Sequence, residues 1–181
     1  MKTENDSLLL LAEKQLDDKQ FALAEESYSE VISSNDISCS SLLRSYYGLI
    51  ACKLQASPNE LMSSQVTDKV FQEDVKNDIE NIYQEMFQSS RLRCFLSEVR
   101  LDRAMFFRAT KQQNKAILAF SEIIEEEKNA LVLFRAFCGR AETYDSIESV
   151  QLYNNDVQIA ESLRCKIANE LNAEIKSLKD V

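Results

Sequence analysis

The chain has 181 residues, two glycines, one proline, no histidine and no tryptophan, and a formal net charge of −9 at pH 7. Without histidine, a Ser-His-Asp or Cys-His catalytic arrangement and any metal site that needs imidazole ligands are excluded. The acidic balance disfavours direct nucleic-acid binding, because phosphate contacts need a basic surface.

The scarcity of turn-forming residues predicts long helices joined by short links. The length is sufficient for one domain with a sizeable core, so we expect a single all-α domain over residues 1–181. No apolar run approaches the ~20 residues that span a bilayer, which predicts no membrane span. Five widely spaced cysteines and the lack of a signal-peptide-like start indicate buried thiols in a reducing compartment, cytoplasmic or nuclear.

In chain order, apolar residues recur at helical spacing through two short segments over about 5–36, linked by the polar residues 17–20. A third helix is predicted over about 39–55, and Pro58 ends it. Residues 56–67 are the most loop-like segment of the chain. Longer helices are then predicted over 68–88 and 92–110.

The next helix is predicted around Phe120 and ends in an exposed charged run at residues 125–128. Another follows over about 131–144, and a long terminal helix is expected after Asn155. We expect eight or nine helices and no strand. Five arginines on and near the 92–110 helix are expected to form salt bridges rather than a basic patch: Arg91, Arg93, Arg100, Arg103 and Arg108.

The segment Ala12–Ile32 is similar to Ala104–Ile124, with seven of the twenty-one aligned positions identical. Small residues recur at the expected midpoints of four helices, at Ala12, Gly48, Ala104 and Gly139. A mid-helix glycine costs roughly 1 kcal/mol relative to alanine, which indicates a packing reason for these two. The open alternative is a non-repeating helical bundle whose helices coincide by chance.

With these residues the chain resembles the tetratricopeptide repeat family, whose 34-residue unit is a helix-turn-helix with small residues where two helices approach closely. The resemblance implies a short α-solenoid of antiparallel helix hairpins. Its units would be a repeat over about 5–36, an irregular repeat with an insertion over about 38–90, a repeat over about 91–128, and a last hairpin over about 130–181. The terminal helix would cap the stack with a polar outer side. Gln15 departs from the family pattern, which has an aromatic or large residue there.

The resemblance also implies an inner groove lined by the first helix of each hairpin, suited to a helical or extended partner segment with basic flanks. Carried over from the family pattern, the groove residues are Asp6, Leu9, Glu13 and Leu16, then Leu42, Ser45, Leu49 and Cys52, then Glu98, Leu101, Met105 and Arg108. The basic clamp with which some co-chaperones hold a terminal carboxylate is absent from the corresponding places.

We therefore expect a non-enzymatic protein-interaction module, an adaptor or assembly subunit within a larger complex, that binds another protein. The groove or the segment 56–90 would carry the partner surface. The alternative is a co-chaperone or assembly-factor domain that delivers a client without a carboxylate clamp. No catalytic residues, cofactor or metal site are expected, since the isolated glycines leave no phosphate-binding loop.

Overall fold

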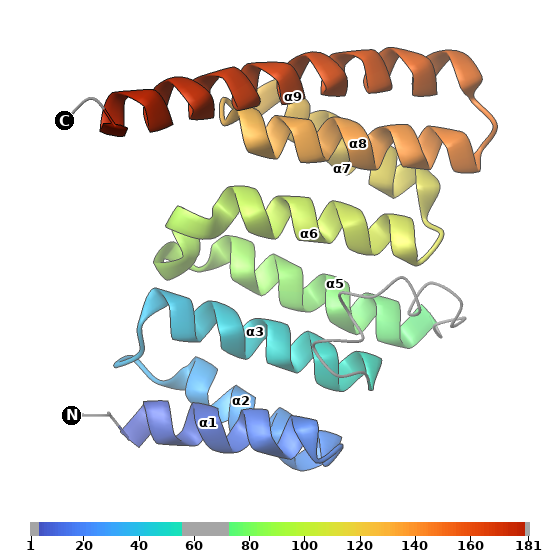
Figure 1. Cartoon of the computed structure of the whole chain (residues 1–181). Helices are drawn as coiled ribbons and strands as arrows, with labels where there is room; N and C mark the ends of the chain where they lie inside the picture. The colour runs from blue at the N-terminus through green and yellow to red at the C-terminus, as the bar shows by residue number, and fades with distance from the viewer. Residues whose placement is uncertain (1–3, 56–72, 180–181) are drawn as a thin grey trace. The chain divides into compact units, whose positions relative to one another are not determined.

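The computed structural model of the chain describes residues 4–55 and 73–179 (Figure 1). Every regular element in this described part is a helix. The prediction of an all-α fold is therefore confirmed. Two compact units divide the chain, unit 1 over Met1–Leu96 and unit 2 over Ser97–Val181, and each is described by itself. A single continuous solenoid stays a prediction.

Unit 1 contains two pairs of helices. The first pair is α1 (Glu4–Asp17) with α2 (Phe21–Ser33), and the second is α3 (Cys39–Leu54) with α5 (Glu73–Gln88), followed by the 3-10 helix η2 (Ser90–Phe95). Helix α2 packs against both α1 and α3, and α3 packs against α5. These bounds follow the predicted repeat at 5–36 and the irregular repeat at 38–90. The loop expected at 56–67 lies outside the described residues.

Unit 2 also contains two pairs of helices, which follow the last two predicted hairpins. These are α6 (Leu96–Ala109) with α7 (Gln113–Glu126), and α8 (Ala130–Ser146) with α9 (Val150–Lys179). One core cluster joins α6, α7 and α8, with the fully buried Ala104, Ala116 and Phe120 at its centre. Helix α8 packs against α7 on one side and α9 on the other.

The first helix of three hairpins ends in the same backbone conformation. Lys19, Gln55 and Lys111 adopt the left-handed region, with φ of 59°, 47° and 59°. Each of them lies seven positions after the small residue at the middle of its helix. The turns at Lys19 and Lys111 also share their hydrogen bonds, since the next residue donates its N–H to the carbonyl five positions back over 2.8 Å. The sequence similarity between the two units is therefore accompanied by the same turn conformation in both.

The small residues allow neighbouring hairpins to pack closely. All four of them, at 12, 48, 104 and 139, are buried. A Cβ atom placed on Gly48 would lie 2.5 Å from Cε1 of Tyr28 on α2, and one on Gly139 would lie 2.6 Å from Cε1 of Phe120 on α7. Each aromatic ring thus occupies the space that a side chain would need. The packing reason expected for both glycines is confirmed.

A paired change explains why Gln15 departs from the repeat pattern. The hydroxyl of Ser27 on α2 donates a 2.8 Å hydrogen bond to Oε1 of Gln15 on α1. At the aligned places of unit 2 stand Phe107 and Ala119, both buried in the apolar core cluster. Unit 1 therefore fills this place with a hydrogen-bonded polar pair, and unit 2 fills it with an apolar pair.

The start of α6 differs from the prediction by four residues. It begins at Leu96 rather than near Leu92, because the residues before it form the 3-10 helix η2. Within η2, the guanidinium of Arg91 donates hydrogen bonds to the carbonyls of Ser34 (2.9 Å) and Ile37 (2.7 Å) in the link between α2 and α3. This contact holds η2 against the link between α2 and α3.

The start of α9 also differs from the prediction. It begins at Val150 rather than after Asn155, because the chain has already turned at Glu148, which has a φ of 58°. The N–H of Ser149 donates to the carbonyl of Tyr144 (2.9 Å), five positions back, as in the turns of the other hairpins. The two asparagines that suggested a break lie inside the helix.

Candidate functional site

Each unit has a shallow depression between the first helices of its two hairpins. In unit 1 the depression has a volume of about 220 Å³ and lies between α1 and α3. In unit 2 it has a volume of about 150 Å³ and lies between α6 and α8. The first helices are those to which the family resemblance assigned the groove, so these depressions are the candidate partner sites.

The depression in unit 1 has an apolar floor and charged edges. Asp6, Leu9 and Leu10 contribute from α1, and Arg44 contributes from α3. The Arg44 guanidinium donates a 2.5 Å hydrogen bond to the carboxylate of Glu13, which bridges the two helices. Leu10 and Arg44 are exposed, so a partner side chain can reach both.

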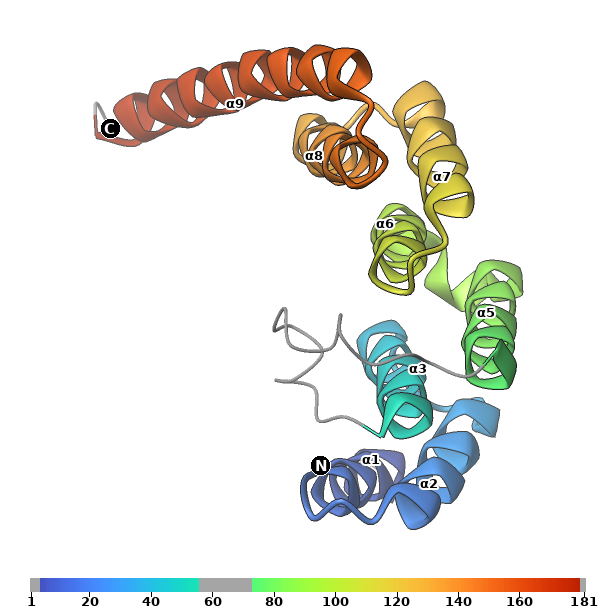
Figure 2. The same ribbon diagram turned by 90° about the vertical axis from the view of Figure 1, so that its right-hand side faces the viewer.

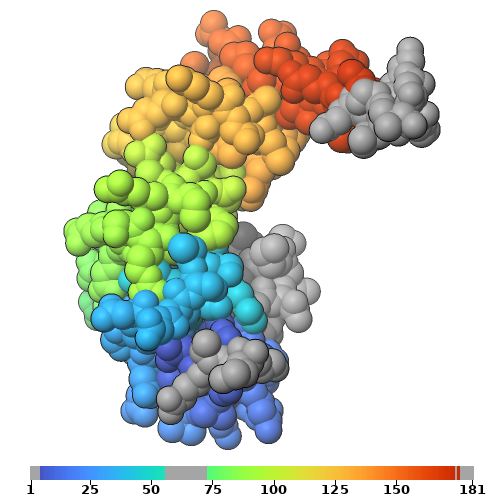
Figure 3. Space-filling view, turned by 90° about the vertical axis from the view of Figure 1, so that its left-hand side faces the viewer, coloured from blue at the N-terminus to red at the C-terminus, as the bar shows by residue number. Residues whose placement is uncertain are grey.

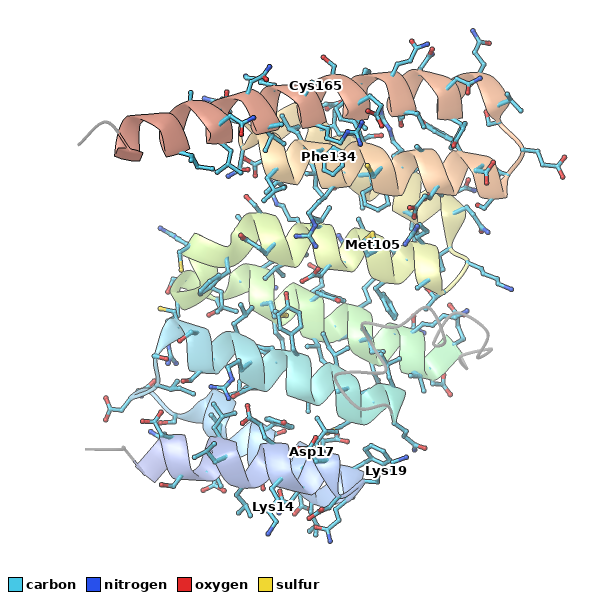
Figure 4. All side chains as sticks on the ribbon, viewed as in Figure 1. Lys14, Asp17, Lys19, Met105, Phe134 and Cys165 are labelled. Carbon is cyan, nitrogen blue, oxygen red and sulfur yellow. The ribbon has the colours of Figure 1, made fainter. Side chains whose placement is uncertain are left out.

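The depression in unit 2 is more apolar. Met105 on α6 and Phe134 on α8, labelled in Figure 4, both line it and are half-buried. Arg108 of α6 forms an ion pair with Glu142 of α8, again between the two first helices. Besides Met105 and Phe134, the residues that line this depression are Leu101, Arg135, Cys138, Gly139 and Glu142.

The predicted groove residues fall into two groups. Six of them have buried side chains that pack in the core: Leu9, Leu16, Leu42, Ser45, Cys52 and Leu101. Leu9 and Leu101 still touch the floors of the two depressions. The others remain at least partly exposed, namely Asp6, Glu13, Leu49, Glu98, Met105 and Arg108.

Several residues of the candidate site were missed at the sequence level. They are Leu10 and Arg44 in unit 1, and Phe134, Arg135, Cys138 and Glu142 in unit 2. The left-handed residue of α8 is Glu148, and the residue seven positions before it is Ala141, which is buried. Counting the family pattern from Ala141 rather than from Gly139 places Arg135, Cys138 and Glu142 in the groove. The spacing of seven residues between the left-handed turn residue and the small residue of the helix was therefore the signal that could have identified them.

Buried charge in unit 2 is concentrated on one ion pair. Arg140 on α8 donates from Nε (2.7 Å) and Nη2 (2.9 Å) to the carboxylate of Asp156 on α9, and from Nη1 (2.8 Å) to the hydroxyl of Ser121 on α7. The Asp156 side chain is 5% exposed. The hydrogen bonds with Asp156 raise the pKa of the guanidinium further above its ordinary value. The pair and the hydrogen bond to Ser121 link α7, α8 and α9.

The arginines before and along α6 act mainly within the fold. Arg100 pairs with Glu126 (2.5 Å) and Arg108 pairs with Glu142, as expected for salt bridges. Arg91 instead donates to backbone carbonyls. The Arg103 guanidinium lies 4.8 Å from the centre of the Phe107 ring.

The cysteines differ from the expectation of buried thiols. Cys52 is buried, and burial raises the pKa of its thiol to about 12. Cys138 is half-buried in the wall of the unit 2 depression, where burial and the charge of Glu161 raise its pKa. The other three, Cys39, Cys94 and Cys165, are exposed. The prediction of core packing was wrong for these three, because each lies on the solvent side of its helix.

Exposed apolar side chains are most frequent on α9. Of the large hydrophobic residues that are exposed in the described ranges, five belong to this helix: Val150, Leu152, Ile159, Leu171 and Ile175. A capping helix was expected to present a polar outer side. These side chains do not contradict that expectation, since α8 has 17 residues against the 30 of α9 and leaves part of the apolar side of α9 uncovered.

Within residues 4–55 and 73–179 no group of three acidic or cysteine side chains is placed to hold a metal ion. In the same ranges no helix has the length and apolar content that crossing a bilayer requires. No family model matches the chain, and no curated protein and no solved structure matches it.

Proposed function

We propose that the chain is a non-enzymatic protein-interaction module, an adaptor or assembly subunit, that binds a segment of a partner protein along the first helices of its hairpins. A cytoplasmic or nuclear location accompanies this proposal. The observation that carries it is the repeated depression, which in both units has apolar lining residues and one lining residue, Arg44 or Glu142, that forms an ion pair between the two first helices.

The chemistry of these depressions suits a peptide better than a small molecule. They are open and shallow, whereas small-molecule pockets enclose most of the ligand surface. An apolar floor beside fixed charges can accept one anchoring side chain and orient the residues around it. Most of the excess negative charge of the chain lies in unit 1, which supports basic residues in the partner segment there.

The experiment compares proteins that co-purify with the wild-type chain, with Met105→Glu and with Leu118→Glu. Leu118 is a control because it is 62% exposed on α7, outside the depression. The proposal expects a stoichiometric partner that is lost with Met105→Glu and retained with Leu118→Glu, and cross-links from that partner to α6 or α8. Circular dichroism and thermal unfolding must first show that both variants fold.

Equal recovery of every partner with both variants would remove the unit 2 depression from the proposal. The same comparison with Leu10→Glu then tests the depression in unit 1. If neither variant changes any partner, the proposed function fails. Recovery of a heat-shock chaperone as the partner would favour the co-chaperone reading of the same fold.

A further inference from the structure

One row of side chains along a face of α9, called the stripe below, packs against α8 at its start and continues past the end of α8. Asp156 and Ala160 lie on this stripe and are buried. Leu163 and Ile167 follow at spacings of three and four residues and are half-buried. The stripe then ends in two side chains that are mostly uncovered, Leu171, which is 55% exposed, and Ile175, which is 43% exposed.

The end of the stripe is exposed because α9 is longer than α8. The two helices contain 30 and 17 residues, and the difference of 13 residues is roughly 20 Å of helix. Figure 2 shows α8 nearly end-on and α9 from the side, so that α9 crosses α8 and its second half runs away from it. In the space-filling view of Figure 3, the red part of α9 extends beyond the residues of α8.

We propose that the second part of this stripe, residues 163–175 of α9, which is half-buried at first and then exposed, binds an amphipathic helix of a partner protein. The stripe is continuous with the face that already packs a helix, namely α8, so the same side-chain spacing is available to a second helix. Aliphatic residues four apart form a ridge that fits a helix groove, and an α-helix offers no free backbone groups to an extended strand.

The flanks of the stripe define the partner further. Glu170 borders one side and Arg164 borders the other, by their helical spacing from Leu171 and Ile167. Both side chains are more than half exposed. The partner helix therefore carries leucine-like residues on one face, a basic residue toward Glu170 and an acidic residue toward Arg164.

Two other occupants fit the stripe less well. A membrane surface attracts helices whose polar face is rich in lysine and arginine, whereas the sequence of α9 contains as many acidic residues as basic ones. A second copy that matches Ile167 with Leu171 in antiparallel fashion would place the two Glu170 side chains on the same flank, about half a turn apart. Like charges at that separation oppose the pairing.

The probe for the test is a synthetic 18-residue helical peptide with leucines at every third and fourth position and lysines beside them. Its matched control carries glutamates in place of the lysines. Fluorescence anisotropy measures the binding of both peptides to the wild-type chain, to Leu171→Asp/Ile175→Asp and to Leu118→Asp. Asp at 171 and 175 removes the apolar end of the stripe, and Asp at 118 changes an equally exposed leucine on α7.

The proposal expects saturable binding of the lysine peptide to the wild type, at least ten-fold weaker binding to the double variant, and no change with Leu118→Asp. The glutamate peptide is expected to bind more weakly than the lysine peptide, and Glu170→Lys is expected to reverse that preference. Equal affinities for the wild type and the double variant overturn the proposal. It is also overturned if the double variant abolishes self-association in sedimentation, or binding to phosphatidylserine vesicles, while neither peptide binds.

Discussion

The ring of Tyr28 on α2 occupies the place that a side chain at position 48 of α3 would need. A Cβ atom on Gly48 would lie 2.5 Å from both Cε atoms of that ring, well inside van der Waals contact. Phe120 and Gly139 repeat this relationship between α7 and α8. In both units, the contact between successive hairpins is therefore an aromatic ring that packs against a glycine of the next helix.

Replacing Gly48 by alanine is expected to destabilise the fold, although alanine favours helices by roughly 1 kcal/mol. The added methyl group must displace the ring of the buried Tyr28, and overpacking of this kind costs about 1–3 kcal/mol. Gly139→Ala is expected to behave in the same way through Phe120. Chemical denaturation gives the free energy of unfolding of each variant.

The control for this prediction is a double variant. Tyr28→Leu removes the ring, so Gly48→Ala introduced in that background is expected to lose most of its cost. A stabilising Gly48→Ala in the wild type would mean that the ring moves away freely, and the close joint would then not explain the glycine.

Asp156→Ala is expected to cost about 3 kcal/mol, because it leaves the half-buried guanidinium of Arg140 without its carboxylate. Glu161→Ala on the same helix is the matched control. Its carboxylate pairs with Arg164 where both side chains are more than half exposed, and such pairs contribute between 0 and about 1 kcal/mol. Thermal or chemical unfolding measures both losses. Similar values for the two variants would contradict the structural role assigned to Asp156.

Thiol labelling tests the positions of the cysteines. At pH 8 the native chain is expected to react rapidly at the exposed Cys39, Cys94 and Cys165, and more slowly at Cys138. Cys52 is expected to react only after unfolding, since it is buried and its raised pKa leaves almost no thiolate. Mass spectrometry of partly labelled chain assigns each site. Early labelling of Cys52 would show that α3 opens in the native state.

Much of the fold was predictable because helical spacing is a local property of the sequence. The apolar spacing over 8–16 and 116–124 predicts the helices there directly. Because the chain has few glycines, the two that lie in the middle of helices indicated a close contact with another helix. The starts of α6 and α9 were not predictable in this way. They depend on the contacts of Arg91 with the carbonyls of another link and on a left-handed conformation at Glu148, a residue type that rarely adopts it.

The candidate site was less predictable than the fold. A family pattern counts positions from one small residue, and α8 contains two candidates, Gly139 and Ala141. Gly139 packs against the ring of Phe120, whereas the residues that line the depression match the family pattern when its positions are counted from Ala141. Only the turn at Glu148 separates these two roles. Burial depends on neighbours distant in sequence, which is why Leu42 and Ser45 belong to the core.

The carboxylate of Glu127 links the end of α7 to the start of α6 and makes stability depend on pH. It accepts a hydrogen bond from the hydroxyl of Ser97 and two from the backbone N–H groups of Lys128 (2.7 Å) and Asn129 (2.8 Å). The Ser97 bond is the largest cause that lowers the pKa of this carboxyl below its ordinary value of 4.5. Because the charged form is favoured by folding, its contribution is fully present above pH 4.5 and is lost as the pH falls below that value.

Glu127→Gln is therefore expected to lower the free energy of unfolding at pH 7, and this loss is expected to be smaller at pH 3, below the ordinary pKa of the carboxyl. Glutamine resembles the protonated acid, so the variant and the wild type converge once the wild-type carboxylate takes up its proton. Glu122→Gln, an exposed position on α7, controls for the removal of one negative charge. Urea unfolding at both pH values measures the differences. A loss of the same size at pH 7 and pH 3 would show that the Glu127 carboxylate contributes through its shape and not through its charge.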